Sequence, residues 1–362
     1  MRDLFLLDPG VTFLNHGSFG ACPRPVFEEY QRWQRELERE PVEFIVRRQP
    51  ELLAQARTAL AEYVGAASSD DLTFVPNAGT GVQVAARALA LHAGDEVLTT
   101  DLEYGALNFA WEWLCARTGA TYLRAPLDEL FDHVGERTRA LFVSHITSAT
   151  GLLLPVEEIV EHARELGLVT IVDGAHAPAH VPVDVESLGA DFYAGNCHKW
   201  LCAPKGAAFL WSRPEWQERV DGAIVSWGYA EDGGTFISRT ELQGTRDAAA
   251  YLSVPAAIEF VREHDDVDRC VALAREARGE LCALLGREPI APEPMVRRMA
   301  SFRVPGDAYA LQRALWDEHR IEIPAMQADL MRISVAMYTE REDVERLLDA
   351  LPALLSSSRS PA

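Results

Sequence analysis

Lysine is almost absent from this chain of 362 residues, which contains only Lys199 and Lys205. Every other basic side chain in the Lys+Arg total of 34 is an arginine. An arginine stays protonated, whereas the amine of a lysine can lose its proton and form an imine. The segment GNCHKWLCAPKG (195–206), which holds both lysines, therefore indicates amine chemistry. For Lys205, in an Ala-Pro-Lys-Gly turn, an ordinary surface position and a phosphate-binding or entry-loop role are equally good interpretations.

The chain also lacks an excess of positive charge and any long apolar run. Its net charge of −21 argues against nucleic-acid binding and predicts a soluble protein that acidic membranes repel. The N-terminal stretch MRDLFLLDPG contains only the short apolar run LFLL, which cannot form the core of a signal peptide, and no later run approaches a membrane span. We therefore expect a cytoplasmic protein without membrane or nucleic-acid partners.

Paired cysteine spacing is absent as well. The 6 cysteines are scattered, which fits a reducing compartment and no disulfide framework. Cys197, His198 and Cys202 lie close together in sequence, but soft-metal sites usually combine two close ligands with two more elsewhere, and no second pair exists. We expect no metal site.

From about residue 72, short apolar runs alternate with longer segments of helical period. Such alternation predicts a mainly parallel sheet between helices, the α/β class. The expected strands are LTFV (72–75), EVLTT (96–100), TYLRA (121–125), ALFVSHI (140–146), TIVD (170–173), DFYAG (191–195) and AAFLW (207–211). The expected helices include 80–92 and 155–167.

Past residue 246 the pattern changes to long amphipathic segments, with strand candidates at 299–304 and 330–337 and a helix-like segment at 308–319. This pattern predicts a smaller α+β domain. We expect an N-terminal segment (1–20) packed at the domain junction, a large domain (21–245) and a small C-terminal domain (246–362).

The residues that could take part in binding or catalysis follow the expected strands, at the edge where open parallel sheets bind their ligands. PNAGTGV after the first strand leads into a helix whose N–H groups suit a phosphate, although alone a Gly-Thr-Gly at a helix start is also typical of a tight turn. Asp173 ends the strand TIVD, and Lys199 follows DFYAG; alone, a carboxylate at that place is also typical of a helix cap. An amine, an acid for a ring nitrogen and a phosphate cradle together match the requirements of pyridoxal phosphate (PLP).

Several stretches together resemble the fold-type I PLP-dependent enzymes of the class V aminotransferase group, and within it the isopenicillin N epimerase family. The resemblance extends from about residue 13 to 260 and is supported further on by LMRISVAMY. It is carried by FLNHGSFGACPRPV, FVPNAGTGV, VLTTDLEYGA, VSHITSATGLLLPV, VDGAHAPAHVPVDV, LGADFYAGNCHKWLCAPKGAAFL and GTRDAAAYLSVPAAIEF.

The resemblance implies a role for each matching residue. Lys199 would form the imine with the cofactor, Asp173 would face the pyridine nitrogen, Tyr104 would stack on the ring, and His176 and Ser148 would lie near its phenolic oxygen. The phosphate would be surrounded by Ala78, Gly79, Thr80, Asn196, His198 and, from the neighbouring subunit, Thr245. Arg332 would bind the α-carboxylate of an amino-acid substrate, with Asn15 and His16 nearby. A homodimer with shared active sites follows from the role of Thr245.

Two departures from the family pattern bear on the reaction. Many relatives have an asparagine where this chain has Ser148, and the nucleophilic cysteine of cysteine desulfurases is missing from HRIEIPAMQADLMR, the segment before and including Arg332. The resemblance favours removal of the Cα proton followed by epimerisation, with β-elimination (C–S lyase) or transamination as alternatives. An epimerase needs a second proton donor, for which His16, Cys197 and Tyr229 are candidates by loop position, with a structural role as the alternative for each. A PLP-binding regulator or inactive scaffold is the non-enzymatic alternative, which the presence of Lys199 and Arg332 disfavours.

Overall fold

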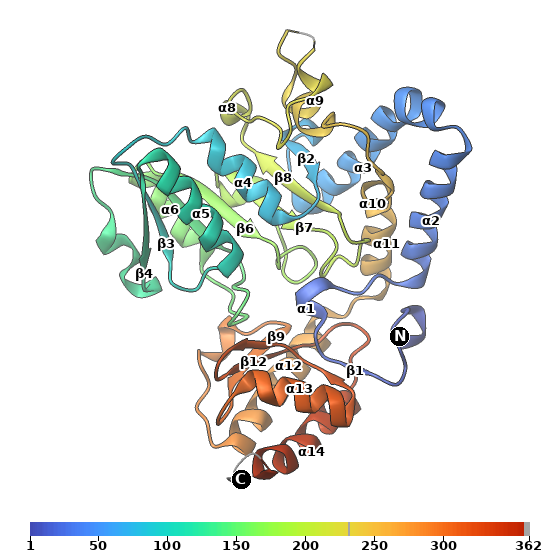
Figure 1. Ribbon diagram of the computed structural model, residues 1–362, viewed down its shortest axis with the longest axis vertical. Helices are drawn as coiled ribbons and strands as arrows, with labels where there is room; N and C mark the ends of the chain where they lie inside the picture. Colours follow the sequence, from blue (N-terminus) through green and yellow to red (C-terminus); the bar gives the residue numbers. More distant parts are fainter. Residues whose placement is uncertain (231, 358–362) are drawn as a thin grey trace. The chain divides into compact units, whose positions relative to one another are not determined.

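A computed structural model describes residues 1–230 and 232–357 of the chain (Figure 1). These residues form two compact units, one made of residues 25–146 and 154–261, and the other of residues 1–24, 147–153 and 262–362 as far as they are described. We call them the large unit and the small unit. The division differs from the expected one in that the N-terminal segment and the stretch 147–153 join the small unit, and residues 246–261 join the large unit.

The large unit is built on a seven-stranded sheet of order β2-β8-β7-β6-β5-β3-β4. The strands are β2 (Leu72–Val75), β3 (Glu96–Thr100), β4 (Thr121–Ala125), β5 (Thr138–Ser144), β6 (Val169–Gly174), β7 (Phe192–Asn196) and β8 (Ala208–Ser212). Strands β3 to β7 pair in parallel, whereas β8 runs antiparallel between β2 and β7. The mainly parallel sheet predicted from the sequence is therefore confirmed.

The large unit also contains helices, several of which pack on the sheet. They are α2 (Arg24–Arg39), α3 (Gln49–Val64), α4 (Ala78–Ala88), α5 (Gly105–Thr118), α6 (Val156–Glu165), α7 (Val185–Leu188), α8 (Pro214–Gln217), α9 (Phe236–Glu241), α10 (Ala249–Leu252) and α11 (Val254–His264). Shorter turns are η2 (Glu43–Arg48), η3 (Ser69–Asp71), η4 (Leu127–His133) and η5 (Trp227–Tyr229). Helices α4 and α5 pack on the face that presents Phe142 and Ile171, and both lie in front of the sheet in Figure 1.

Helix α4 lies unusually close to β7, because Gly81 faces the strand. A Cβ at Gly81 would come within 2.9 Å of the Ala194 Cβ, so a side chain here would push the helix away. Asn77 begins α4 as its N-cap, its side-chain oxygen accepting the Thr80 N–H at 2.8 Å. Packing and capping together fix the N-terminus of α4 beyond the carboxyl end of β2.

A buried polar pair occupies the opposite face of the sheet. The Tyr193 hydroxyl and His145 Nδ1 are 2.9 Å apart, and burial lowers the pKa of His145 to about 4. Tyr193 crosses so close to β6 that a Cβ at Gly174 would meet its ring and hydroxyl at 2.3 Å. Gly174, directly after Asp173, is thus required by packing rather than by a turn.

The small unit contains an antiparallel sheet of order β11-β12-β9 and a two-stranded parallel pair, β1 with β10. Its elements are η1 (Arg2–Leu4), β1 (Thr12–Phe13), α1 (His16–Phe19), α12 (Val267–Leu285), η6 (Glu293–Met295), β9 (Met299–Arg303), α13 (Ala308–His319), β10 (Ile321–Glu322), β11 (Ala325–Gln327), β12 (Leu330–Ser334) and α14 (Arg341–Ser357). Helix α12 packs on β9, and a buried ion pair joins Arg298 to Asp265 at 2.7 Å. The α+β character expected for the C-terminal region is present.

Three negative findings hold for the part of the chain that the structure describes. None of its helices has the length and apolarity to cross a bilayer. Within the same residues, no cluster of three or more His, Cys, Asp or Glu side chains is arranged to hold a metal ion. The cysteines are free thiols, and all but Cys22 are buried.

Candidate active site

The carboxyl ends of several strands of the large unit meet at one edge of the sheet. Because β2, β3, β6 and β7 run in the same direction, the residues that follow them share this edge. The first turn of α4 follows β2, Tyr104 follows β3, Asp173 ends β6 and Lys199 follows β7. The topology thus places the first turn of α4, Tyr104, Asp173 and Lys199 at the same edge of the sheet.

Lys199 contacts a buried histidine. Its Nζ lies 3.0 Å from Nε2 of His176, and the indole nitrogen of Trp200 lies 3.4 Å from His176 Nδ1. An indole N–H can only donate, so His176 Nδ1 accepts, and a neutral imidazole then carries its proton on Nε2. That proton faces the amine of Lys199, an arrangement that suits an unprotonated, nucleophilic amine.

Asp173 is a buried carboxylate at the end of β6, on the sheet face covered by α4 and α5. Burial raises its pKa, while the Ala175 N–H, which donates to Oδ1 at 2.9 Å, and Lys199 in its protonated form lower it. An anion in such a place is favoured by a nearby cation. The carboxylate is therefore suited to hold a protonated nitrogen.

The first turn of α4 offers backbone donors at the same edge. Asn196 on β7 accepts the Ala78 N–H through Oδ1 at 2.8 Å, which joins β7 to the helix terminus. Among the described residues, the Gly79 N–H has no hydrogen-bond acceptor. A free N–H at the positive end of a helix is suited to a phosphate oxygen.

His198 and Tyr104 complete the expected cofactor residues of the large unit. The Nδ1 of His198 lies 3.0 Å from the carbonyl oxygen of Ala207, and burial lowers the pKa of His198 to about 4. Its Nε2 is thus the nitrogen left for another partner. Tyr104 is the N-cap of α5, and its side chain is 48% exposed.

Sequence reasoning missed Glu103, directly before Tyr104. This carboxyl group is buried, accepts hydrogen bonds from Thr100 and Ser144, and has a pKa raised by burial to about 7. Trp200, which contacts His176, was missed as well. In the sequence, only their positions could have pointed to them: Glu103 precedes Tyr104 in DLEYGA, and Trp200 follows Lys199 in NCHKW.

Thr245 lies in the exposed segment between α9 and α10 of the large unit. The loop that precedes α9 exposes Ile224, Val225 and Trp227, the last at 82%. The Ile224 N–H donates to the side chain of Gln243 at 2.9 Å, which ties this apolar loop to the segment of Thr245.

The small unit contains Arg332, Asn15, His16 and Ser148. Arg332 on β12 is buried and donates from Nη1 to the carbonyl oxygen of Ser148 and from Nη2 to Ser18 Oγ at 3.4 Å. Its Nε has no hydrogen-bond partner among the described residues, and burial lowers its pKa to about 10. Keeping a buried guanidinium without a carboxylate partner is costly. Such a group is suited to an anionic ligand.

Asn15 and His16 lie at the start of α1, close to residues of the same unit. Asn15 donates to Glu322 Oε1 at 2.9 Å and accepts from Ser18 at 2.5 Å. His16 Nδ1 lies 2.9 Å from the hydroxyl of Tyr338. Asn15 is thus linked through Ser18 to Arg332, whereas His16 is engaged with Tyr338.

The other candidate proton donors have structural surroundings. Cys197 is completely buried, and burial raises its pKa, which keeps the thiol protonated and away from solvent. The Tyr229 hydroxyl donates to Asp221 at 3.0 Å and accepts the Gly222 N–H at 3.1 Å within its own loop. Neither the burial of Cys197 nor the hydrogen bonds of Tyr229 link these groups to Lys199.

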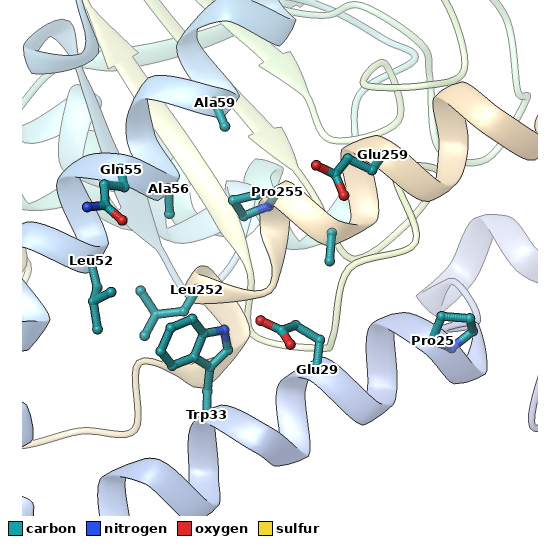
Figure 2. A pocket seen from close by; sticks show the side chains of 11 residues that line it. Pro25, Glu29, Trp33, Leu52, Gln55, Ala56, Ala59, Leu252, Pro255 and Glu259 are labelled. Carbon is teal, nitrogen blue, oxygen red and sulfur yellow. The ribbon is translucent and has the colours of Figure 1, made fainter.

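A separate cavity of about 570 Å³ lies in the large unit between α2, α3 and the α10–α11 segment (Figure 2). Trp33, Leu52 and Pro255 contribute apolar surface, and the carboxylates of Glu29 and Glu259 extend toward it. None of the cofactor or substrate residues selected above lines this cavity. It is therefore distinct from the sheet edge.

Comparison with known proteins identifies the family. The model of the family described as aminotransferase class-V matches residues 25–347, and the chain belongs to this family. The isopenicillin N epimerases of Streptomyces clavuligerus and Amycolatopsis lactamdurans are each 36% identical to it, over 98% of this chain and 97% of the relative. A putative L-cysteine desulfhydrase of Oryza sativa subsp. japonica is 29% identical, over 96% of this chain and 84% of the relative. The resemblance drawn from the sequence motifs is thus confirmed.

Solved structures agree with this assignment. C-DES with glycine covalently linked to its PLP cofactor superposes with a TM-score of 0.84 at 25% identity, covering 96% of this chain and 98% of that chain. The chain is a PLP-dependent enzyme, and the residues at its sheet edge fit the cofactor. Lys199 supplies an amine, Asp173 supplies a buried anion, and the first turn of α4 supplies a free N–H.

Proposed function

We propose that this enzyme epimerises an amino acid: Lys199 accepts the proton from Cα, and a water molecule or a second acid on the opposite face donates one back. The observation that supports removal of the Cα proton, a step that all the candidate reactions share, is the 3.0 Å contact between Lys199 Nζ and His176 Nε2, which places the amine beside a buried imidazole. The relatives named isopenicillin N epimerase support this reaction over its alternatives.

Each large-unit residue has a distinct task in this proposal. When bound, PLP stabilises negative charge at Cα of the amino acid by delocalising it into the pyridine ring. Lys199 holds the cofactor and accepts the Cα proton, and His176 orients the amine. Asp173 holds the proton on the ring nitrogen. Tyr104 packs on the ring, and Ala78, Gly79, Thr80, Asn196 and His198 bind the phosphate.

Arg332 binds the substrate α-carboxylate through two parallel hydrogen bonds, and Ser148, Asn15 and His16 belong to the same neighbourhood of the small unit. Two observations support this role of Arg332. Its Nε has no hydrogen-bond partner, and its guanidinium forms no ion pair among the described residues. A planar guanidinium binds a carboxylate at two points, which the ammonium of a lysine cannot do.

Arg332→Ala is expected to weaken amino-acid binding by about 3 kcal/mol, roughly a hundredfold, while the protein stays folded. Removing a buried charge that lacks an ion-pair partner does not strand another charge, so thermal stability should fall less than in a variant that leaves a buried charge unpaired. Arg298→Ala is the contrasting variant, because it would leave Asp265 buried and unpaired at a cost of about 3–5 kcal/mol. Unchanged apparent substrate affinity in Arg332→Ala would contradict the assignment.

A C–S lyase is the second candidate, favoured by the desulfhydrase relatives and by the likeness to C-DES. A desulfurase that forms a protein-bound persulfide is disfavoured, because no cysteine occurs between His319 and Arg332. Transamination has no specific observation in its favour.

Product analysis in deuterated water separates these reactions. With a panel of L- and D-amino acids and peptides that carry a free α-amino acid group, we expect deuterium at Cα together with inversion of configuration, without release of pyruvate, sulfide or a keto acid. Release of pyruvate and sulfide from cysteine, without inversion of any substrate, would establish the lyase instead. Stoichiometric persulfide on any of the enzyme's cysteines would overturn the exclusion of desulfurase chemistry.

We also propose that the active form is a cytoplasmic homodimer in which Thr245 of each subunit contacts the phosphate bound by the other. The exposed Ile224, Val225 and Trp227 beside the Thr245 segment support an interface there, since such a patch is typical of an association surface.

A further inference from the structure

Glu103 is a carboxyl group buried in a hydrogen-bonded network. Its Oε1 accepts from Thr100 Oγ1 at 2.7 Å and from the Ser144 N–H at 3.1 Å, and its Oε2 contacts the Ser144 hydroxyl. Its own carbonyl oxygen accepts from Asn108 Nδ2 at 3.4 Å, and Asn108 in turn accepts from the hydroxyl of Tyr122. The network fixes the turn after β3 to the end of β5.

The same contacts bring Glu103 toward Asp173. Ser144 on β5 and Asp173 on β6 are register partners, so their side chains point to the same face of the sheet. Neighbouring strands are about 4.8 Å apart. The His145 N–H donates to the carbonyl oxygen of Asp173, so the Ser144 N–H points away from β6 and Glu103 approaches Ser144 from the side of β3. The Glu103 carboxyl group is thus about one strand spacing from Asp173, near enough for the charge of Asp173 to act on it. Among the described residues, no arginine or lysine is hydrogen-bonded to Glu103.

We propose that Glu103 is a positioning residue that is protonated in preference to Asp173, so that the negative charge of these two buried groups resides on Asp173. Two carboxylates that share a buried site do not both ionise readily, and the one with the better cationic neighbour keeps the charge. In the holoenzyme Asp173 has that neighbour in the protonated ring nitrogen that the proposed function assigns to it. This inference rests on the proposed role of Asp173 toward the ring nitrogen, but not on the reaction that follows.

The hydrogen bonds accommodate a neutral Glu103. Hydroxyl groups can donate or accept, so a proton on Oε2 can be donated to Ser144 Oγ while Oε1 continues to accept from Thr100 and the Ser144 N–H. The charges that act on Glu103 point the same way. Burial and the charge of Asp173 raise the pKa of Glu103 from 4.5 to about 7, although the hydrogen bonds to Glu103 lower it. Tyr122 on β4 adds no charge near neutral pH, because burial raises the pKa of its hydroxyl.

Infrared difference spectroscopy of the holoenzyme between pH 5.5 and 8.5 tests the protonation state directly. We expect the wild type to show a protonated-carboxyl band that is lost with a midpoint near pH 7, and we expect Glu103→Gln to lack it. In Asp173→Asn the midpoint should move to lower pH, because the neighbouring negative charge is gone. Absence of the band from the wild type, its persistence in Glu103→Gln, or an unchanged midpoint in Asp173→Asn would each overturn the proposal.

Thermal unfolding gives an independent check. A carboxyl group whose folded-state pKa is raised contributes stability that is fully present below the unfolded pKa and is lost as the pH rises through the folded value. For Glu103 this window extends from about 4.5 to about 7. The Tm of Glu103→Gln should therefore rise relative to the wild type between pH 5 and 8, and a Tm difference independent of pH would contradict the proposal.

The two tests separate this proposal from the proposed reaction. Failure of epimerisation leaves the infrared band and the Tm difference unchanged, since both report on Glu103 alone. Glu103→Asp serves as a second variant, because it keeps an ionisable group but shortens the reach to Ser144. We expect it to retain a titrating carboxyl band at a shifted midpoint, and loss of the band would contradict the assignment.

Discussion

Lys199→Ala is expected to lower turnover by on the order of 10⁴-fold or more, the scale at which loss of a covalent nucleophile acts. The reason is that one amine both holds the cofactor and moves the Cα proton in the proposed reaction. The folded structure should survive, because Lys199 is only partly buried and follows β7 rather than filling the core. Turnover, together with the visible absorbance of the cofactor, measures the effect.

Lys205→Ala is a matched control, since it removes the chain's other lysine from an exposed position in the same segment. It should leave turnover and absorbance within a few-fold of the wild type. Borohydride reduction followed by peptide mapping provides a second measurement, which should place the cofactor on Lys199. A label on Lys205 would mean that both the lysine and the register of the proposed site are wrong.

The strands of the large sheet could be predicted closely, because nearly every one is buried on both faces and so appears in the sequence as a continuous apolar run. Residues 72–75, 96–100 and 121–125 are strands with the expected bounds. The remaining strands are shifted by one or two residues at their ends, where hydrogen bonding rather than hydrophobicity sets the limit. The antiparallel direction of β8 was not predicted, since strand direction depends on the length and path of the connection.

The division into units was harder to predict, because it depends on contacts between distant segments. Residues 147–153 lie between two apolar segments of the large unit, yet Leu153 donates its N–H to Met295 and Ser301 donates to Ala149. These bonds join the stretch to the small unit. Nothing in the local sequence distinguishes it from an ordinary strand-to-helix loop.

Lys199 could be selected from the residues alone because it is a lysine in a chain nearly without lysine, whereas Tyr104 and His176 could be selected only through the resemblance to the family. Glu103 could not be selected in this way. The chain has 55 acidic residues, and what sets Glu103 apart is burial against Ser144, a contact between two strand ends far apart in the sequence. Its raised pKa results from this packing and has no signature in a single sequence.

Asp173→Asn is expected to lower turnover on the order of 10³-fold while leaving the protein folded and able to bind PLP. The amide oxygen can still accept the Ala175 N–H, which preserves the local structure. The amide nitrogen of asparagine, however, is a donor where the second carboxylate oxygen was an acceptor. A neutral amide therefore cannot hold a proton on the ring nitrogen. Negative charge at Cα then loses its stabilisation.

Stability distinguishes this loss of function from unfolding. Because burial raises the pKa of Asp173, the ionised carboxylate of the cofactor-free protein costs stability as the pH rises, and a neutral asparagine removes that cost. Cofactor-free Asp173→Asn should therefore be at least as stable as the wild type at pH 8, although it turns over far more slowly. Asp173→Glu keeps the charge and should retain more activity than Asp173→Asn. Near-normal turnover by Asp173→Asn would show that this carboxylate does not hold the proton on the ring nitrogen.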